Sequence, residues 1–319
     1  MSSKEEKSFE KSLPKGYKKG VLQERKENGV VQCHVCQREC LVPKGKRGFC
    51  TTRINIDGTL YSMIYGRFPS GVQIDPIEKK PLYHFHPGTF VASIGSYGCN
   101  FRCKQCLNWA SLWDFSEDNV GKPLNWDHKG LIISPKEFIE IAKRYGCPGV
   151  AFTYNEPTIW IEYVYDAAKL AKKDNLFTVF VTNGYITKKG VDYLGNLIDA
   201  WSVDFKGWSN RSYAKQGNIG VSAAGVRDVT KYAKEKYGIH VEIDTLVIPT
   251  INDDLGEMRL LAQWIFKNLG EDTPWHLIRY IPELAWSSDF RKIPPTPLLS
   301  AEKIAKIGNE VGLKFVYYR

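Results

Sequence analysis

Three cysteines stand within one short segment of the chain, the string SYGCNFRCKQCLNW. Cys99, Cys103 and Cys106 follow the spacing CxxxCxxC, and we refer to them as the cysteine triplet. A structural zinc site normally closes with four protein ligands, whereas three thiolates hold three irons of a four-iron, four-sulfur cluster and leave the fourth iron open. The triplet therefore predicts a [4Fe–4S] cluster completed by a non-protein ligand, for which S-adenosylmethionine is the best candidate. The alternative is a set of cysteines that line a core or bind zinc.

A second set of cysteines lies nearer the N-terminus, with the spacing CxxCxxxCx9C. This cysteine quartet consists of Cys33, Cys36, Cys40 and Cys50. Four thiolates can close a tetrahedral zinc site or bind an additional iron–sulfur cluster, and the spacing alone does not distinguish the two. We expect a small metal-stapled module in which zinc is favoured, and cysteines without a ligand are the alternative. Cys147, alone before a predicted strand, is expected to be a small core residue.

From residue 89 onward, the elements that must position these cysteines repeat in a regular order. An apolar run of the strand type, a turn rich in Gly, Asn or Pro, and a helical stretch recur about six times, as parallel βα units require. The predicted strands lie within 90–98, 149–157, 176–184, 200–207, 240–249 and 274–282, and the predicted helices within 135–146, 158–175, 188–199, 221–238 and 255–270. The sequence therefore predicts an α/β fold with a partial (β/α)6 TIM-like barrel and a small Cys-rich N-terminal module.

Polar side chains gather where these predicted strands end. Function in αβ barrels collects at the carboxyl ends of the strands. Besides the cysteine triplet, the candidates there are Asn155, Glu156, Thr182, Asn183, Asp204 and Lys206. The alternative is that the TNG and DFKG strings are ordinary turns, in which Asn and Gly tolerate positive φ.

Four segments are expected along the chain: a polar, charged stretch at 1–30, the Cys-rich module and its connector at 31–88, the barrel at 89–285, and a C-terminal helix and strand at 286–319. In the connector, His84 and His86 alternate on one face of an extended segment, where packing is favoured over a role at the cluster. Lys79 and Lys80 carry the same two interpretations. In the last barrel strand, His276 and Tyr280 share one face and Arg279 lies on the other, so either face could contact substrate or cofactor.

The composition describes a globular chain of 319 residues, 43% of them hydrophobic. No apolar run reaches the roughly 18 residues of a membrane span, and the first residues are polar and mixed in charge, so we expect a cytoplasmic protein. Eight cysteines with metal-type spacings indicate a reducing compartment. The net charge is +9, but the lysines alternate with glutamates and do not form a basic stripe. Nucleic-acid binding is therefore unlikely on sequence grounds.

Several unusual strings also occur together in one order: CxxCxxxCx9C, DPIEKKPLYHFHPG, GCNFRCKQCLNW, AFTYNEPT and VDFKG. Over roughly residues 30 to 285 the chain resembles the AmmeMemoRadiSam branch of radical S-adenosylmethionine (SAM) enzymes, which is related to pyruvate formate-lyase activating enzymes. The resemblance implies that the cysteine triplet holds the cluster, that SAM chelates the open iron, and that one electron cleaves the sulfonium to give a 5′-deoxyadenosyl radical.

The resemblance also implies cofactor contacts. In the activating enzymes a Gly-Gly-Glu-Pro segment contacts the methionyl amine; here Glu156 and Pro157 match, while Tyr154 and Asn155 replace the glycines. The Thr-Asn-Gly and Asp-Phe-Lys strand ends resemble segments near the methionyl carboxylate and the ribose, which nominates the Thr182, Asn183, Asp204 and Lys206 side chains.

Two positions depart from the family pattern. Gln105 stands where an aromatic residue often lies near the adenine, and Val181 stands where activating enzymes have an aspartate of a monovalent-cation site. We therefore carry neither the aromatic adenine contact nor the cation site over to this chain.

The leading hypothesis is an enzyme that cleaves SAM reductively and abstracts hydrogen from a protein glycine, a small molecule or a nucleotide. A small electron donor such as ferredoxin or flavodoxin is the expected partner. Two alternatives stay open. One is a non-catalytic, metal-stapled module that binds RNA or protein, and the other is SAM-dependent methyl transfer.

Overall fold

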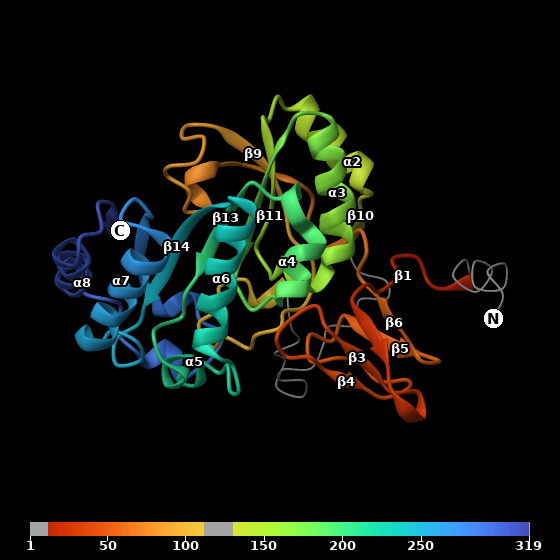
Figure 1. Ribbon diagram of the computed structural model, residues 1–319, viewed down its shortest axis with the longest axis horizontal. Helices are drawn as coiled ribbons and strands as arrows, with labels where there is room; N and C mark the ends of the chain where they lie inside the picture. The colour runs from red at the N-terminus through yellow and green to blue at the C-terminus, as the bar shows by residue number, and fades with distance from the viewer. Residues whose placement is uncertain (1–11, 112–129, 319) are drawn as a thin grey trace.

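The computed structural model describes residues 12–111 and 130–318, so part of the predicted N-terminal segment, residues 1–11, lies outside the described residues. One eight-stranded sheet organises the chain, in the order β16-β15-β14-β13-β12-β11-β9-β8 (Figure 1). Neighbours from β9 to β16 pair in parallel, and β8 pairs antiparallel with β9. The α/β class with a mostly parallel sheet is therefore confirmed.

The six predicted barrel strands all form, and they lie side by side in chain order. They are β9 (Phe90–Ile94), β11 (Gly149–Phe152), β12 (Phe177–Thr182), β13 (Ala200–Asp204), β14 (His240–Val247) and β15 (Trp275–Arg279). Two further strands extend the sheet, β8 (Gln73–Pro76) at one edge and β16 (Val316–Tyr318) at the other. The segment around β8 reads as an extended connector in the sequence because it is short and ends in proline, yet its backbone completes the sheet edge.

The helices follow the predicted strand–helix alternation. They are α2 (Pro135–Arg144), α3 (Ile161–Lys173), α4 (Lys188–Leu194), α5 (Asn210–Lys215), α6 (Ala223–Tyr237), α7 (Leu255–Leu269) and α8 (Leu298–Val311). Local signals fix their starts: Ser134 and Glu137 form a capping box at α2, and Asp254 caps α7. Three of the helices, α3, α4 and α5, follow the loops that carry the polar strand-end residues.

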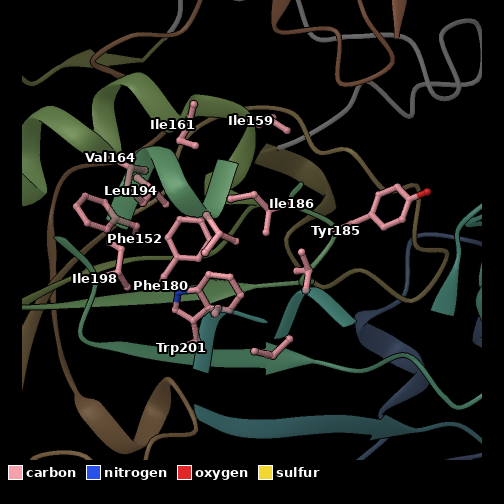
Figure 2. Close-up of a cluster of buried hydrophobic side chains, with 14 of the residues drawn as sticks. Phe152, Ile159, Ile161, Val164, Phe180, Tyr185, Ile186, Leu194, Ile198 and Trp201 are labelled. Carbon is pink, nitrogen blue, oxygen red and sulfur yellow. The ribbon is translucent and has the colours of Figure 1, made fainter. Parts of the chain in front are cut away.

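The main core lies between the helices and one face of the sheet. Side chains alternate between the two faces of a strand, and Phe152, Phe180 and Trp201 all point to the helix side. Figure 2 shows these three in one cluster with Ile161 and Leu194, which come from α3 and α4. This dry layer holds the strands rigid, so the side chains at their carboxyl ends occupy fixed positions.

The inner face of the sheet is filled at its amino end by residues 77–86, which we call the plug segment. Ile77 and Leu82 are fully buried in a small apolar cluster with Val91, Ala151 and Val179. These partners lie on three neighbouring strands, so the plug segment closes the end of the barrel at which the strands begin.

A buried carboxylate on β14 binds the plug segment. Glu242 accepts hydrogen bonds from the amides of Tyr83 and His84, at 2.9 and 2.8 Å, and from the Nε2 atoms of His240 and His276. Burial alone would raise the pKa of Glu242, but these four donors lower it to about 2. The carboxylate therefore stays ionised and ties the plug segment to the sheet.

The histidines of interest from the sequence have packing roles at this end of the sheet. His84 packs on Phe315 and meets the Tyr317 hydroxyl at 2.7 Å, and His86 stacks on Phe177. His276 binds Glu242. All three lie toward the amino end of the strands, away from the cysteine triplet that follows β9. The packing interpretation of the two connector histidines is confirmed.

The N-terminal part, residues 18–62, consists of two small antiparallel sheets, β2-β3-β4 and β1-β6-β5. Its strands are β1 (Lys18–Lys19), β2 (Gln23–Arg25), β3 (Val31–Cys33), β4 (Leu41–Val42), β5 (Arg53–Ile56) and β6 (Thr59–Ser62). They lie beside the barrel at the end opposite α8, as the red strands of Figure 1 show. The next strand in the chain, β7 (Arg67–Phe68), pairs antiparallel with β10 (Leu131–Ile132). Over the described residues, no helix combines the length and apolarity that crossing a membrane requires.

Candidate functional site

The cysteine triplet lies on the cysteine loop, residues 95–108, which leaves the carboxyl end of β9. Cys99, Cys103 and Cys106 are all free thiols of low exposure. Burial, and then the proximity of Cys103, raise the pKa of Cys106 to about 12. Among the described residues, no three His, Cys, Asp or Glu side chains converge around one point as the ligands of a single ion do.

A loop after α5 holds the cysteine loop in place. Asn218 donates from Nδ2 to the Cys103 sulfur at 3.1 Å, and its Oδ1 accepts the amide of Arg102. The amide of Lys104 donates to the carbonyl of Gln216, and the indole of Trp286 donates to the carbonyl of Cys103 at 2.8 Å. Asn218 is a site residue that the sequence analysis missed, because no local pattern distinguishes its GNIG turn from any other turn.

Asn155 ties the cysteine loop to the end of β11. Its Oδ1 accepts the amide of Ser96 at 2.9 Å and the indole of Trp160 at 3.1 Å. Its Nδ2 donates to the carbonyls of Tyr97 and Gly98, at 3.1 and 3.0 Å. All the hydrogen-bonding capacity of this amide is thus used within the protein, which makes Asn155 a positioning residue for the loop that carries Cys99.

The residue before Asn155 adopts a backbone conformation that usually belongs to glycine. Tyr154 has φ +68°, at one of the two positions where related enzymes have glycine. Its hydroxyl donates to Asp75 at 2.6 Å, and the same carboxylate binds Lys79 and Lys80 at 2.7 and 2.8 Å. These contacts hold the strained turn. They also give both lysines of the connector a structural partner.

Glu156 anchors the neighbouring strand end. Its carboxylate accepts hydrogen bonds from the amide and hydroxyl of Thr158, from the Thr182 hydroxyl at 2.8 Å, and from the amide of Asn183 at 2.7 Å. Burial raises the pKa of Glu156, although these donors oppose the shift. The side chain therefore fixes the end of β12 rather than reaching into open space.

Asn183 reaches the cysteine triplet directly. Its Nδ2 donates to the Asn100 side chain at 2.8 Å and lies 4.0 Å from the Cys99 sulfur. The end of β12 thus touches the cysteine loop, as the shared carboxyl edge of parallel strands predicts.

Asp204 and Lys206 form an ion pair at the end of β13. Burial alone would lower the pKa of Lys206, but the charges of Asp204 and of the nearby Cys103 and Cys106 raise it above its ordinary value. Asp204 also has a buried Oδ1 for which residues 12–111 and 130–318 provide no hydrogen-bond partner. The site therefore presents a fixed positive charge and a free acceptor beside two of the three thiols.

A cavity of ≈ 250 Å³ opens next to the cysteine loop. It lies between the ends of β9 and β11 and the loop before β8, and Ser96, Asn108, Tyr154 and Gln73 line it. Its lining is mostly polar. A small polar group could therefore enter beside the cysteine loop.

The family model for the radical SAM superfamily matches residues 93–262, which is more than half of the chain. The chain belongs to the radical SAM superfamily. Membership implies a [4Fe–4S] cluster and SAM as cofactors, and the donor set just described fits them: three thiols on one loop, with an ammonium and amide groups around them.

The chain is also similar to individual proteins. An uncharacterized protein of Methanocaldococcus jannaschii, MJ0808, is 37% identical over 302 residues, covering 94% of this chain and 84% of that protein. The pyruvate formate-lyase-activating enzyme of Clostridium pasteurianum is 28% identical over 187 residues, covering 57% of this chain and 72% of that enzyme. A radical SAM methyltransferase structure from Sphaerobacter thermophilus has the same fold, with a TM-score of 0.51, 12% identity, and coverage of 72% of this chain and 66% of that one.

The remaining predicted positions of this radical SAM chain are placed as follows. Gln105 is buried and its side chain binds that of Gln216. Val181 packs with the apolar cluster inside the sheet. Tyr280 donates its hydroxyl to the carbonyl of Phe290, which is a packing role, and Arg279 is exposed at the end of β15.

The four cysteines of the quartet also come together. All of them line a single cavity of ≈ 20 Å³ in the N-terminal part. Burial raises the pKa of Cys33 to about 11 and raises the pKa of Cys36 further. The identity of any metal there stays a prediction.

Proposed function

We propose that this radical SAM protein cleaves SAM reductively and abstracts a hydrogen atom from a substrate that enters at the carboxyl ends of the strands. The observation that carries the proposal is the cysteine triplet, held at the end of β9 with Asn183 and Lys206 beside it. When bound, the cluster supplies one electron to the sulfonium of SAM, which releases methionine and a 5′-deoxyadenosyl radical.

The residues around the triplet take distinct roles in this proposal. Lys206 binds the methionyl carboxylate, since a buried ammonium next to an anionic group is strongly favourable. Asp204 accepts from a ribose hydroxyl through its unpartnered Oδ1. Asn155, Glu156 and Thr182 orient the loop and strand ends, because their polar atoms already bind protein groups. Precise placement and exclusion of water then supply most of the catalysis.

The substrate enters from one side only. The plug segment fills the amino end of the barrel, and β8 and β16 occupy the two edges of the sheet. The polar cavity of ≈ 250 Å³ admits a group of about residue size. We place the chain in the AmmeMemoRadiSam branch and propose a glycine on a flexible protein segment as substrate, with a polar small molecule as the second candidate.

The first test is formation of 5′-deoxyadenosine by anaerobically reconstituted protein, reduced with dithionite. Wild type is expected to form it, and Cys99→Ala is expected to lose it together with one cluster. Cys147→Ala is a matched control, because this cysteine is buried in the core behind α2 and its loss should leave both product and cluster unchanged.

Other products would overturn parts of the proposal. S-adenosylhomocysteine in place of 5′-deoxyadenosine would establish methyl transfer. Zinc at the triplet, without binding of SAM, would establish the binding-module alternative. Reduction by ferredoxin or flavodoxin in place of dithionite tests the proposed electron donor.

A further inference from the structure

The cysteine quartet surrounds an enclosed space beside the barrel. Cys33 ends β3, Cys36 and Cys40 lie on the loop to β4, and Cys50 precedes β5. All four line the same cavity, whose other walls are largely apolar and include Val35, Val42, Phe49 and Ile159. Four thiols facing one dry cavity, in a chain without a disulfide among its described residues, indicate a site for a thiophilic metal centre.

Four thiolates around one space can bind a single zinc ion or a polynuclear iron–sulfur centre in which each thiolate binds a separate iron. The surroundings of the quartet distinguish the two.

The quartet adjoins the triplet. A side-chain carbon placed on Gly98 would lie 2.8 Å from the carbonyl oxygen of Cys50, so the backbone next to Cys99 rests on the backbone of Cys50. Arg102 spans the same junction and donates to the carbonyls of Cys99 and Phe49, at 2.9 and 2.5 Å. Electron transfer between two metal centres depends steeply on such proximity.

Positive charge lies between the two cysteine sets. The guanidinium groups of Arg38 and Arg102 lie 3.5 and 4.2 Å from the ring centroid of Phe49. Arg38 also donates to the carbonyl of Asn100. Two thiolate-bound clusters carry net negative charge and repel each other, and cations between them reduce that repulsion. The arrangement therefore suits two anionic clusters held close together.

We propose that the cysteine quartet binds a second iron–sulfur cluster that relays electrons to the radical SAM cluster across the contact between Cys50 and Gly98. An external one-electron carrier, a reduced flavin or iron–sulfur protein, reduces the quartet cluster by one electron. That cluster returns to its oxidised state when it passes the electron to the triplet cluster, where the electron enters the sulfonium bond of SAM. The relay rests on the proposed function; the second cluster itself does not.

The second cluster is tested in the full chain with the triplet removed, as Cys99→Ala/Cys103→Ala/Cys106→Ala. After anaerobic reconstitution we expect iron and sulfide in equal amounts, no zinc, and an electron paramagnetic resonance (EPR) signal after reduction that added SAM does not change. Zinc in place of iron, or no metal, would overturn the proposal. Because the quartet is intact in this variant, misfolding of the N-terminal part does not confuse the result.

The complementary variant is Cys36→Ala/Cys40→Ala, with Cys147→Ala as control. We expect it to lose the SAM-insensitive EPR signal and to keep the SAM-sensitive one, while wild type and the control show both signals with broadening from their mutual magnetic interaction. Signals that do not interact in doubly reduced wild type would contradict the proximity of the two clusters.

The relay is tested by the rate of 5′-deoxyadenosine formation. With a reduced flavodoxin as the sole donor, the quartet variant should form 5′-deoxyadenosine at least tenfold more slowly than wild type. With dithionite, which is small enough to reach the triplet cluster, the difference between the two rates should become smaller. An equal deficit with both donors would overturn the relay. A quartet cluster in a protein that forms no 5′-deoxyadenosine would contradict the proposed function alone, and zinc in an active protein would contradict this inference alone.

Discussion

Lys206 carries a buried positive charge beside the cysteine triplet, and among the described residues it forms an ion pair with Asp204 on the same strand end. A charge-assisted contact of this kind contributes about 1.5–3 kcal/mol. Removing the ammonium should therefore change cofactor binding without changing the thiols that hold iron.

We expect Lys206→Met to weaken SAM binding about tenfold to a hundredfold, with iron content as in wild type. Calorimetric titration of the reconstituted protein measures the affinity, and Lys215→Met, on the exposed end of α5, is the control. An unchanged dissociation constant would remove Lys206 from the cofactor site.

A second prediction for a single residue concerns Glu242 and the dependence of the free energy of unfolding on pH. Its pKa is about 2 in the folded protein against an ordinary value of 4.5, so the folded state binds fewer protons than the unfolded state between these values. Its contribution, of about 3 kcal/mol, is complete above pH 4.5 and is lost as the pH falls toward 2. Anaerobic urea unfolding of wild type and Glu242→Gln should show a stability difference at pH 7 that shrinks below pH 4.5; a difference independent of pH would contradict the assignment.

At the scale of elements, the Asn155 amide makes several of the contacts that join β9, β11 and the cysteine loop. Asn155 satisfies two donors and two acceptors from the loop and from the following helical turn. Each group left unsatisfied by a substitution costs about 1–3 kcal/mol where water cannot replace the contact.

Asn155→Ala should lower the free energy of unfolding by about 2–4 kcal/mol and reduce the iron retained after gel filtration. Thermal melting and iron analysis measure the two effects, with Asn268→Ala on α7 as control. Full iron content in a destabilised variant would show that the amide supports the strand end but not the cysteine loop.

The order of strands and helices could be predicted from local patterns, because buried parallel strands are continuous apolar runs and most of the helices between them begin at side-chain caps. Lys206 and Asn183 could be placed near the triplet for the same reason, since parallel strands end at one edge. Asn218 and the edge strand β8 could not be predicted. Their positions depend on contacts with residues far away in the sequence, which leave no periodic signal. In the structure, polar atoms of Asn155 and Glu156 already bind protein groups, which supports the positioning role proposed for both side chains.

At the scale of the whole molecule, a buried ion pair joins the N-terminal part to the barrel. Arg53 of β5 binds Glu162 of α3 at 2.7 Å, and both side chains are almost inaccessible to solvent. Glu162 also accepts the amide of Val21. Removing one partner of such a pair leaves the other buried and uncompensated, at a cost of about 3–5 kcal/mol.

Arg53→Met should therefore be strongly destabilising, whereas Arg53→Met/Glu162→Gln should recover most of the loss, because glutamine is neutral and still accepts the Val21 amide. Urea unfolding of the single and double variants measures this. A double variant as unstable as the single one would mean that Arg53 acts through its packing and not through its charge.

The contact between the plug segment and Glu242 has a consequence for synthesis of the chain. The amides of Tyr83 and His84 bind a carboxylate that lies 159 and 158 residues further along the sequence. A ribosome therefore releases both cysteine sets well before the chain that anchors the segment between them exists. Contacts between such distant residues form late and slowly. Iron delivered during translation would meet an unfinished barrel, so stable loading of the radical cluster has to wait until β14 has been made and has closed over the plug segment.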